Sequence, residues 1–230
     1  MLEHLGEKLV LKFGGPDMFG LDIITLLMSW VVMALIIGFA WWLRKGLEQD
    51  VEEEPSGRLI VLESLINLLE EQFADAFESE RLRTQLYSFI STLFLFITVS
   101  NWISIVPGLS SPTQDFNIPL SFALLVFLVS HYYGMRINGT GTYLKSFAEP
   151  YPFMLPMNVI SEIAKPISHS FRLFGNVFGG AVLISVLTAR LIPILLPAFF
   201  QAFYGLFIGA IQAFVFALLA VSYINVAVQQ

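Results

Sequence analysis

Residues 165–180 read KPISHSFRLFGNVFGG, and they place a permanent positive charge, Arg172, in one of the least polar parts of the chain. The apolar pattern around them runs from Met157 to Arg190, and a second one runs from about residue 194 to 228. As helices, these stretches would each be roughly 50 Å long, whereas the hydrocarbon core of a bilayer is about 30 Å thick. The pattern therefore predicts a long helical hairpin, 157–228, that is strongly tilted in a membrane.

The composition agrees with a membrane location. The 230 residues are 56% hydrophobic and only 13% charged, and a soluble domain has about twice that charged fraction. The net charge of -6 argues against nucleic acid as a partner, because phosphate binding needs a basic surface. The absence of cysteine excludes thiol catalysis, disulfides and cysteine-bound metals. The chain is therefore predicted to be an integral membrane protein in contact with lipid.

Three further apolar stretches are long enough to cross a bilayer. The first, residues 23–43, ends with two tryptophans at interface level and is followed by Arg44 and Lys45. The others are at about 86–106 and 118–135. With the hairpin they predict an all-α protein of about five membrane helices. The predicted segments are an N-terminal segment 1–22, a first span 23–43, a connecting segment 44–84 and a membrane core 85–230.

The basic residues predict the orientation. Residues 44–83 contain five Lys or Arg, whereas the loop 101–119 contains none. By the positive-inside rule, 44–84 lies in the cytoplasm. We therefore expect an extracytoplasmic N-terminus and a cytoplasmic C-terminus. As a separate expectation, the membrane is a bacterial plasma membrane.

Residues 58–77, RLIVLESLINLLEEQFADAF, repeat apolar side chains at helical spacing with acids on the other faces. This pattern predicts an amphipathic helix lying in the cytoplasmic interface. Its acidic polar face leaves open a second role, the docking of a cytoplasmic partner.

The sequence contains no metal-binding cluster, phosphate loop or catalytic triad, so we expect no cofactor, no bound metal and no catalytic chemistry by the chain alone. What remains is a sparse set of polar groups at membrane depth. At 100° per residue, Lys165, Arg172 and Gly179 share a helix face, and Gly175 with Gly179 forms a small-xxx-small pair that lets another helix approach.

Two interpretations of Arg172 stand side by side. In the first, it reaches the interface or pairs with Glu162, and its glycines only pack the hairpin. In the second, it is functional, because an intramembrane charge costs about 2.5 to 3.5 kcal/mol on insertion scales. The long apolar run that follows Arg172 favours the second.

Several motifs carry a family resemblance. SFRLFGNVFGG, followed some forty residues later by GAIQAFVFALLAVSYI, resembles subunit a of the rotary F-type ATP synthases, as do NWISIVPGLSSPTQDFNIPLSFAL and EPYPFMLPMNVISEIAKPIS before it. The resemblance covers the chain from about residue 85 onward. It implies a membrane stator whose two offset half-channels carry protons or Na⁺ to and from a rotating c-ring. The implied partners are the c-ring, the peripheral-stalk b subunits and the rest of the F1Fo complex.

The resemblance also implies roles for individual residues. Arg172 matches the essential arginine that faces a carboxylate on each ring subunit, Gln212 would lie opposite it on the hairpin, and Asn176 would line the outer half-channel. The weaker candidates for ion translocation are Glu162, His169, Asp115 and Tyr223. The alternatives are an interhelical hydrogen bond for Asn176 and Gln212, a packed histidine for His169 and a helix cap for Asp115.

One departure concerns the outer half-channel. Many family members place a titratable Glu or His at the positions of Ala181 and Gly205, and neither residue here can exchange a proton. We expect the outer path to use Glu162 or His169, ordered water, or a hydrated cation. The choice between protons and Na⁺ stays open.

The rival function is a secondary ion transporter or channel that works alone. Such transporters often consist of two repeated halves with broken helices, and this sequence has no such repeat. A purely structural scaffold would not explain an arginine embedded between glycines.

Overall fold

The computed structural model describes residues 10–12, 20–45, 57–106, 109, 111–190 and 195–229. Most of the predicted N-terminal segment 1–22 lies outside these residues, as do the connection at 46–56 and the hairpin turn at 191–194.

Within the described residues, four helical stretches are long and apolar enough to cross a membrane. They are α1 (Ile23–Arg44), α3 (Glu80–Ile103), α4 (Asn117–Asn138) and the continuous stretch Phe199–Gln229. α6 (Leu155–Arg190) is longer than any of them, with 36 residues. The prediction of an all-α membrane protein with about five membrane helices is confirmed.

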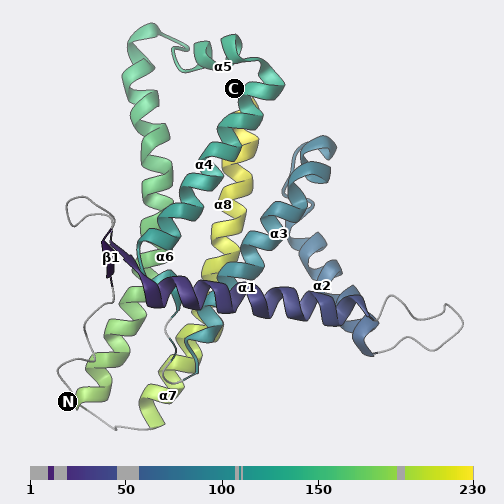
Figure 1. Ribbon diagram of the computed structural model, residues 1–230. Coiled ribbons are helices and arrows are strands. Elements are labelled where there is room, and N and C mark those ends of the chain that lie inside the picture. Colours follow the sequence, from purple (N-terminus) through teal and green to yellow (C-terminus); the bar gives the residue numbers. More distant parts are fainter. Residues whose placement is uncertain are drawn as a thin grey trace, which may run out of the picture.

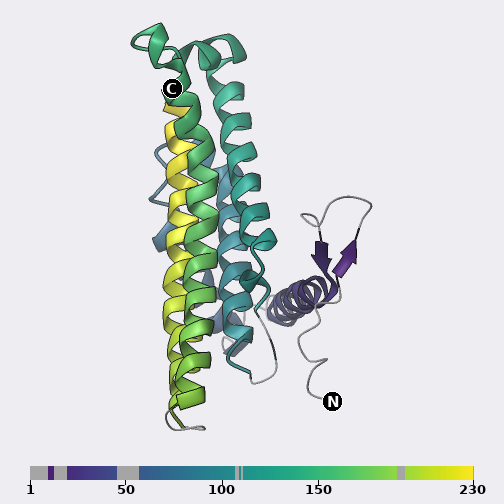
Figure 2. The same cartoon turned by 90° about the vertical axis from the view of Figure 1, so that its left-hand side faces the viewer.

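The C-terminal hairpin is formed by α6 and the helices after it. α7 (Leu195–Ala202) leads into a π-helical turn, η4 (Phe203–Ile208), and then into α8 (Gly209–Gln229). In Figures 1 and 2, α6, α8 and α4 run alongside one another, whereas α1 lies across them. α1 is about 33 Å long and fits a bilayer when upright, but α6 is about 54 Å long and must tilt to stay within it.

The remaining elements are short, apart from the amphipathic helix. α2 (Gly57–Phe73) buries Leu69 and Phe73, and Glu70 at its C-terminal end forms an ion pair with Arg83 of α3 at 2.7 Å. The other short elements are η2 (Pro112–Gln114), α5 (Thr140–Ser146) and η3 (Pro152–Met154). An antiparallel pair that the sequence did not predict, β1 (Val10–Lys12) and β2 (Gly20–Asp22), precedes α1.

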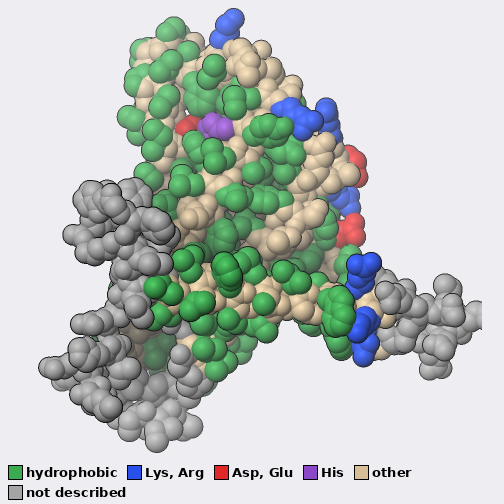
Figure 3. Space-filling view, in the orientation of Figure 1, with side chains coloured by type: hydrophobic (Ala, Val, Ile, Leu, Met, Phe, Trp, Pro, Cys, Tyr) green, Lys and Arg blue, Asp and Glu red, His purple; other side chains and the backbone are tan. Residues whose placement is uncertain are grey.

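The core lies where α3 and α4 pack against α8. α8 presents small residues there, with Ala213, Ala217 and Ala220 fully buried. Small side chains let helix backbones approach closely, and this close packing replaces the hydrophobic driving force that lipid cannot supply. Hydrophobic side chains cover most of the face seen in Figure 3, and the charged groups gather mainly toward its edges.

Two helix boundaries differ from the sequence-based expectation. α3 begins at Glu80, about six residues before the apolar stretch, because its first turns are a polar extension beyond the apolar run. The predicted uninterrupted helix from 194 to 228 contains the π-helical turn η4. Hydrophobic periodicity does not detect such a turn, because FYGLFI is almost uniformly apolar and therefore carries no periodic signal.

Gly134 of α4 marks the closest approach between helices at the end of the bundle near α5. A methyl group added there would lie 2.6 Å from the Ala227 carbonyl oxygen of α8 and 2.6 Å from the ring of Tyr143 of α5. Glycine is required because two neighbouring elements occupy the space of a side chain.

We expect Gly134→Ala to force α4 away from α8 and to lower stability by about 1 to 3 kcal/mol, a typical cost of overpacking. Thermal unfolding of the purified protein in mild detergent measures this. The matched control is Gly38→Ala in α1, where an added methyl group meets no atom within 4 Å. Equal melting temperatures for the two variants would contradict this account of the packing.

Candidate functional site

Arg172 lies on an exposed face of α6. Within the described residues it forms no hydrogen bond or ion pair. Glu162, the acid considered as its partner, instead pairs with Lys165 one turn further along α6. The interpretation that Glu162 neutralises Arg172 is therefore wrong, because Lys165 is nearer along the helix and occupies that carboxylate.

The glycines near Arg172 share its open surface. An added methyl group at Gly175 or Gly179 would meet no described atom within 4 Å, and both residues are exposed together with Asn176. We call these four residues, Arg172, Gly175, Asn176 and Gly179, the Arg172 face. It is shallow, bears one charge and leaves room for a helix from another chain.

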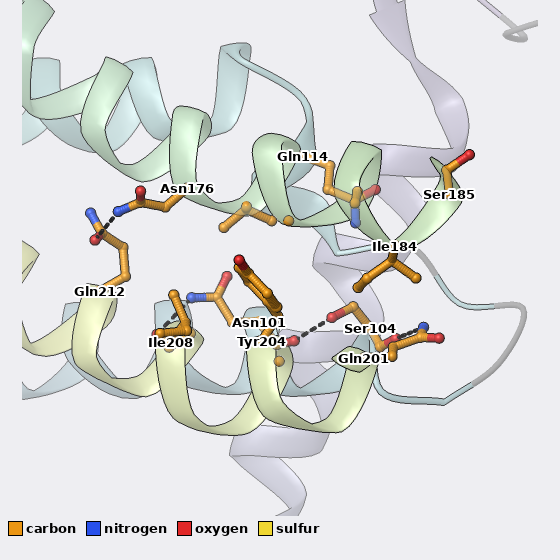
Figure 4. Close-up of a pocket in the computed structure, with 15 residues that line it drawn as sticks. Asn101, Ser104, Gln114, Asn176, Ile184, Ser185, Gln201, Tyr204, Ile208 and Gln212 are labelled. Atoms are coloured by element: carbon orange, nitrogen blue, oxygen red, sulfur yellow. Dashed lines mark hydrogen bonds between the residues drawn. The ribbon is translucent and has the colours of Figure 1, made fainter. Parts of the chain in front are cut away.

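A cavity of about 230 Å³ lies beside the C-terminal half of α6 and is bounded by α3, α6, η4 and α8 (Figure 4). We call it the α6–α8 cavity. Its polar lining comes from Asn101, Ser104, Gln114, Asn176, Ser185, Gln201, Tyr204 and Gln212. All are neutral side chains that can hydrogen bond water, so the cavity is suited to holding water at membrane depth.

Asn176 and Gln212 join the two long helices at the end of this cavity that is nearest to Arg172. The Asn176 amide donates to Gln212 Oε1 at 2.5 Å, and the two side chains point toward one another in Figure 4. Gln212 is only 5% exposed, and its Nε2 has no partner among the described residues. An interhelical hydrogen bond and a polar lining therefore coexist here, and Gln212 contacts Asn176 one turn beyond Arg172.

Asn101 of α3 holds the other wall of the cavity. Its Nδ2 donates to the Gly209 carbonyl at 2.9 Å, and its Oδ1 accepts from Thr113 at 2.7 Å. Trp102 Nε1 donates to the Leu206 carbonyl within η4 at 3.3 Å. Because lipid cannot hydrogen bond the backbone, side chains from α3 stabilise the irregular π-helical turn.

Ala181 and Gly205, the positions without a titratable group, both line the α6–α8 cavity. A methyl group added at Gly205 would lie 2.6 Å from Cγ1 of Ile105, in the turn after α3, so Ile105 fills the space that a larger side chain would need. Gly180, next to Ala181, is packed against the Tyr204 ring in the same way, at 2.8 Å. Ile105 thus occupies the room that a titratable side chain at position 205 would take, whereas Ala181 borders the open cavity.

A second polar region surrounds Glu162 in the N-terminal half of α6. Glu162 is 13% exposed, pairs with Lys165 and lies 3.9 Å from Nε2 of His131 on α4. Glu162 and Lys165 line both an open groove of about 290 Å³ next to α5 and a pocket of only about 10 Å³ next to His169 and Tyr223. Charged groups, absent from the α6–α8 cavity lining, are concentrated here.

The remaining predicted residues take separate places. His169 is buried, stacks on Phe216 at 3.7 Å between ring centroids and has Nε2 3.2 Å from the Phe216 carbonyl. Tyr223 contacts the edge of the His169 ring. Oδ1 of Asp115 accepts a hydrogen bond from the backbone N–H of Asn117 at 3.0 Å, at the start of α4. Asp115 thus caps this helix and lies outside both polar regions.

Arg172 separates the two polar regions along α6. Glu162 precedes it by ten residues and Ala181 follows it by nine, about 15 Å and 14 Å along the helix axis. Neither Glu162 nor His169, which we expected in the outer path, lines the α6–α8 cavity.

Sequence reasoning did not identify several residues of these regions. Asn101, Gln201 and Tyr204 line the cavity, and His131 faces Glu162 from another helix. The signal available in the sequence was weak: each is a lone polar residue in an apolar segment, and such residues usually face the bundle interior.

The chain matches the family model described as ATP synthase A chain over residues 26–225. It is 36% identical over 200 residues to ATP synthase subunit a 1 of Crocosphaera subtropica, covering 87% of this chain and 84% of that protein. It is 34% identical to ATP synthase subunit a of Desulforamulus reducens, covering 87% and 78%. With ATP synthase subunit a of Legionella pneumophila strain Paris, the identity is 32% and the coverage 98% and 95%.

Cysteine labelling tests whether the α6–α8 cavity contains water, and the native chain has no cysteine that would interfere. A thiol reacts only as the ionised thiolate, which forms where water can solvate it. We therefore expect Ala181→Cys, in the cavity, to react with a small, membrane-impermeant thiol reagent roughly ten-fold faster or more than Val182→Cys. Val182 is the matched control, since it is adjacent but faces outward with 46% exposure. Equal labelling rates would contradict a water-filled cavity.

Proposed function

Because this chain belongs to the ATP synthase A chain family and is therefore an ion-translocating stator subunit of the Fo membrane sector, we propose that Arg172 is the charge that separates its two half-channels. As part of the F1Fo complex, the subunit couples the flow of protons or Na⁺ to ATP synthesis. The observation that carries the proposal is an exposed arginine that forms no ion pair or hydrogen bond with the described residues. It lies between a polar region of neutral side chains and a polar region of charged side chains.

The open Arg172 face supports a partner that supplies the missing acid. A guanidinium stays charged at any physiological pH, so it cannot relay a proton. It can attract an ionised carboxylate, promote release of the ion bound there and repel cations from a direct path. The partner proposed for this face is the c-ring. Its subunits would pack against Gly175 and Gly179 and bring their carboxylates past Arg172.

The two polar regions fit the two half-channels. The α6–α8 cavity would form the outer half-channel, with Asn176 and Gln212 at the end near Arg172. Its neutral lining would guide protons or hydrated Na⁺ through water, without a titratable side chain at Ala181 or Gly205. The groove beside Glu162, with His169 and Tyr223 behind it, would form the inner half-channel. Asp115 would act only as a helix cap.

The proposed topology follows from the distribution of basic residues. Arg44, Arg136 and Lys145 lie at helix ends or in connections that would face the cytoplasm, with the N-terminus outside and the C-terminus inside. The acidic α2 and its ion pair with α3 would then lie at the cytoplasmic surface, where the peripheral-stalk b subunits are the proposed neighbours. A plasma membrane location agrees with the bacterial sources of the relatives.

A transporter working alone is not favoured. The family match covers the long helices, and the Arg172 face lacks a closing wall from the chain itself within the described residues. An isolated pore would need such a wall.

We expect Arg172→Ala to reduce ATP-driven ion pumping and ATP synthesis by more than about thirty-fold, while the complex still assembles. The reason is that losing an electrostatic barrier of a few kcal/mol opens a direct leak between the half-channels. Pumping by reconstituted F1Fo, measured with a potential-sensitive dye, checks this. The control is Arg136→Ala, which removes a cation at the end of α4 and is expected to keep coupling. Coupled pumping by Arg172→Ala would refute the proposed role.

A further inference from the structure

His131 of α4 is an unassigned titratable side chain that lies against the charged pair of α6. Its Nε2 is 3.9 Å from Glu162 Oε2, while Lys165 pairs with the other carboxylate oxygen, Oε1. The side chains of His131, Glu162 and Lys165 are 20%, 13% and 27% exposed. The three groups therefore form a compact, partly buried cluster, which we call the His131 cluster.

The hydrogen bonds of His131 determine its proton arrangement. Its Nδ1 lies 2.9 Å from the Phe127 carbonyl, which can only accept, so Nδ1 carries the proton in the neutral ring. The Nε2 lone pair then faces Glu162. A second proton can only bind at Nε2, where it creates an imidazolium directly opposite the carboxylate.

The surroundings hold the ring in this position. The rings of Phe127, Tyr143 and Phe147 contact His131 from α4, α5 and the residue after α5, at centroid distances of 4.0, 5.9 and 6.5 Å. Burial, and secondarily the charge of Glu162, raise the pKa of Tyr143 to about 12, so this phenol stays neutral. The charged and titratable groups on the packed elements are Glu162, Lys165, His169, Arg172 and Arg190 on α6, Tyr143 and Lys145 on α5, Tyr223 on α8, and Tyr132, Tyr133 and Arg136 on α4 itself. Of these, Glu162 and Tyr143 contact His131.

Two residues of the cluster border two neighbouring hollows. Glu162 and Lys165 are the residues shared by the open groove next to α5 and the small pocket that contains His169 and Tyr223. An ion moving from the groove toward the middle of α6 would pass these two side chains.

We propose that His131 is a further residue of the inner half-channel, where with Glu162 and Lys165 it sets the charge at the mouth according to cytoplasmic pH. This inference rests on the proposed function, since it takes the groove next to α5 as the inner mouth. With neutral His131, the charges of Glu162 and Lys165 cancel. Protonation at Nε2 gives the cluster a net charge of +1, which opposes cations entering from the cytoplasm.

The test uses inverted membrane vesicles that contain the whole F1Fo complex, in which the cytoplasmic face meets the buffer. The initial rate of ATP-driven membrane potential is measured from about pH 8 to about pH 5.5, a range that spans ordinary imidazole titration. The quantity compared is the ratio of the His131→Gln rate to the wild-type rate, because this ratio cancels the pH dependence of ATP hydrolysis. It serves equally well for protons and for Na⁺.

We expect this ratio to rise roughly five-fold as the pH falls, because only the wild type gains the repelling charge at a site of intermediate dielectric. His169→Gln is the matched control: it removes the histidine of α6, whose ring stacks on Phe216 and whose Nε2 faces the Phe216 carbonyl at 3.2 Å instead of Glu162. Its ratio to wild type is expected to be independent of pH, whatever its absolute rate.

Glu162→Gln gives an independent test if His131→Gln fails to assemble. It leaves Lys165 unbalanced at every pH, so pumping is expected to be slow even at about pH 8. A pH-independent ratio for His131→Gln, or wild-type pumping by Glu162→Gln, would overturn the inference. Arg172→Ala in the same vesicles separates the two claims: if it abolishes pumping while the His131 ratio stays constant, only the inference on His131 fails.

Discussion

A guanidinium at membrane depth needs a counter-charge or water, and this chain supplies Arg172 with neither an acid nor a hydrogen bond from the described residues. The acid on the same helix, Glu162, is already paired with Lys165. The surrounding α6 surface is open and contains two glycines at which an added methyl group would meet no described atom within 4 Å. These features together make the Arg172 face an incomplete surface, which is reasonable for a stator subunit whose proposed partner moves past it.

The long α6 places two chemically different environments on either side of this charge. Beyond Arg172, a cavity is lined by neutral amides and hydroxyls, and Asn101 and Trp102 hydrogen bond the carbonyls of its irregular wall. Before Arg172, acidic and basic side chains cluster around Glu162. Because α6 is about 54 Å long, it stays within the bilayer only when tilted. One helix thus contributes to both polar regions, one on each side of Arg172.

Much of the fold was predictable because lipid imposes a simple rule on sequence: apolar stretches of sufficient length become helices. The spans, the amphipathic helix and the excessive length of the hairpin helices all follow from this rule. The rule did not predict which helices pack together, because hydrophobic periodicity identifies the apolar face of a helix but not the helix that packs against it. For this reason Glu162 was expected in the outer path, although its contacts are with Lys165 and with His131 of another helix.

The sequence by itself determined the membrane location, the helical class, the family motifs and the prominence of Arg172, because hydrophobicity, charge and motif spacing are local properties of the chain. Only the tertiary structure decided that Ala181 and Gly205 border a single cavity, that Ile105 fills the space beside Gly205, and that Glu162 belongs to the other polar region. The physical reason is that cavities and ion pairs arise where distant segments meet, as Asn101 meets Gly209 across 108 positions of the chain.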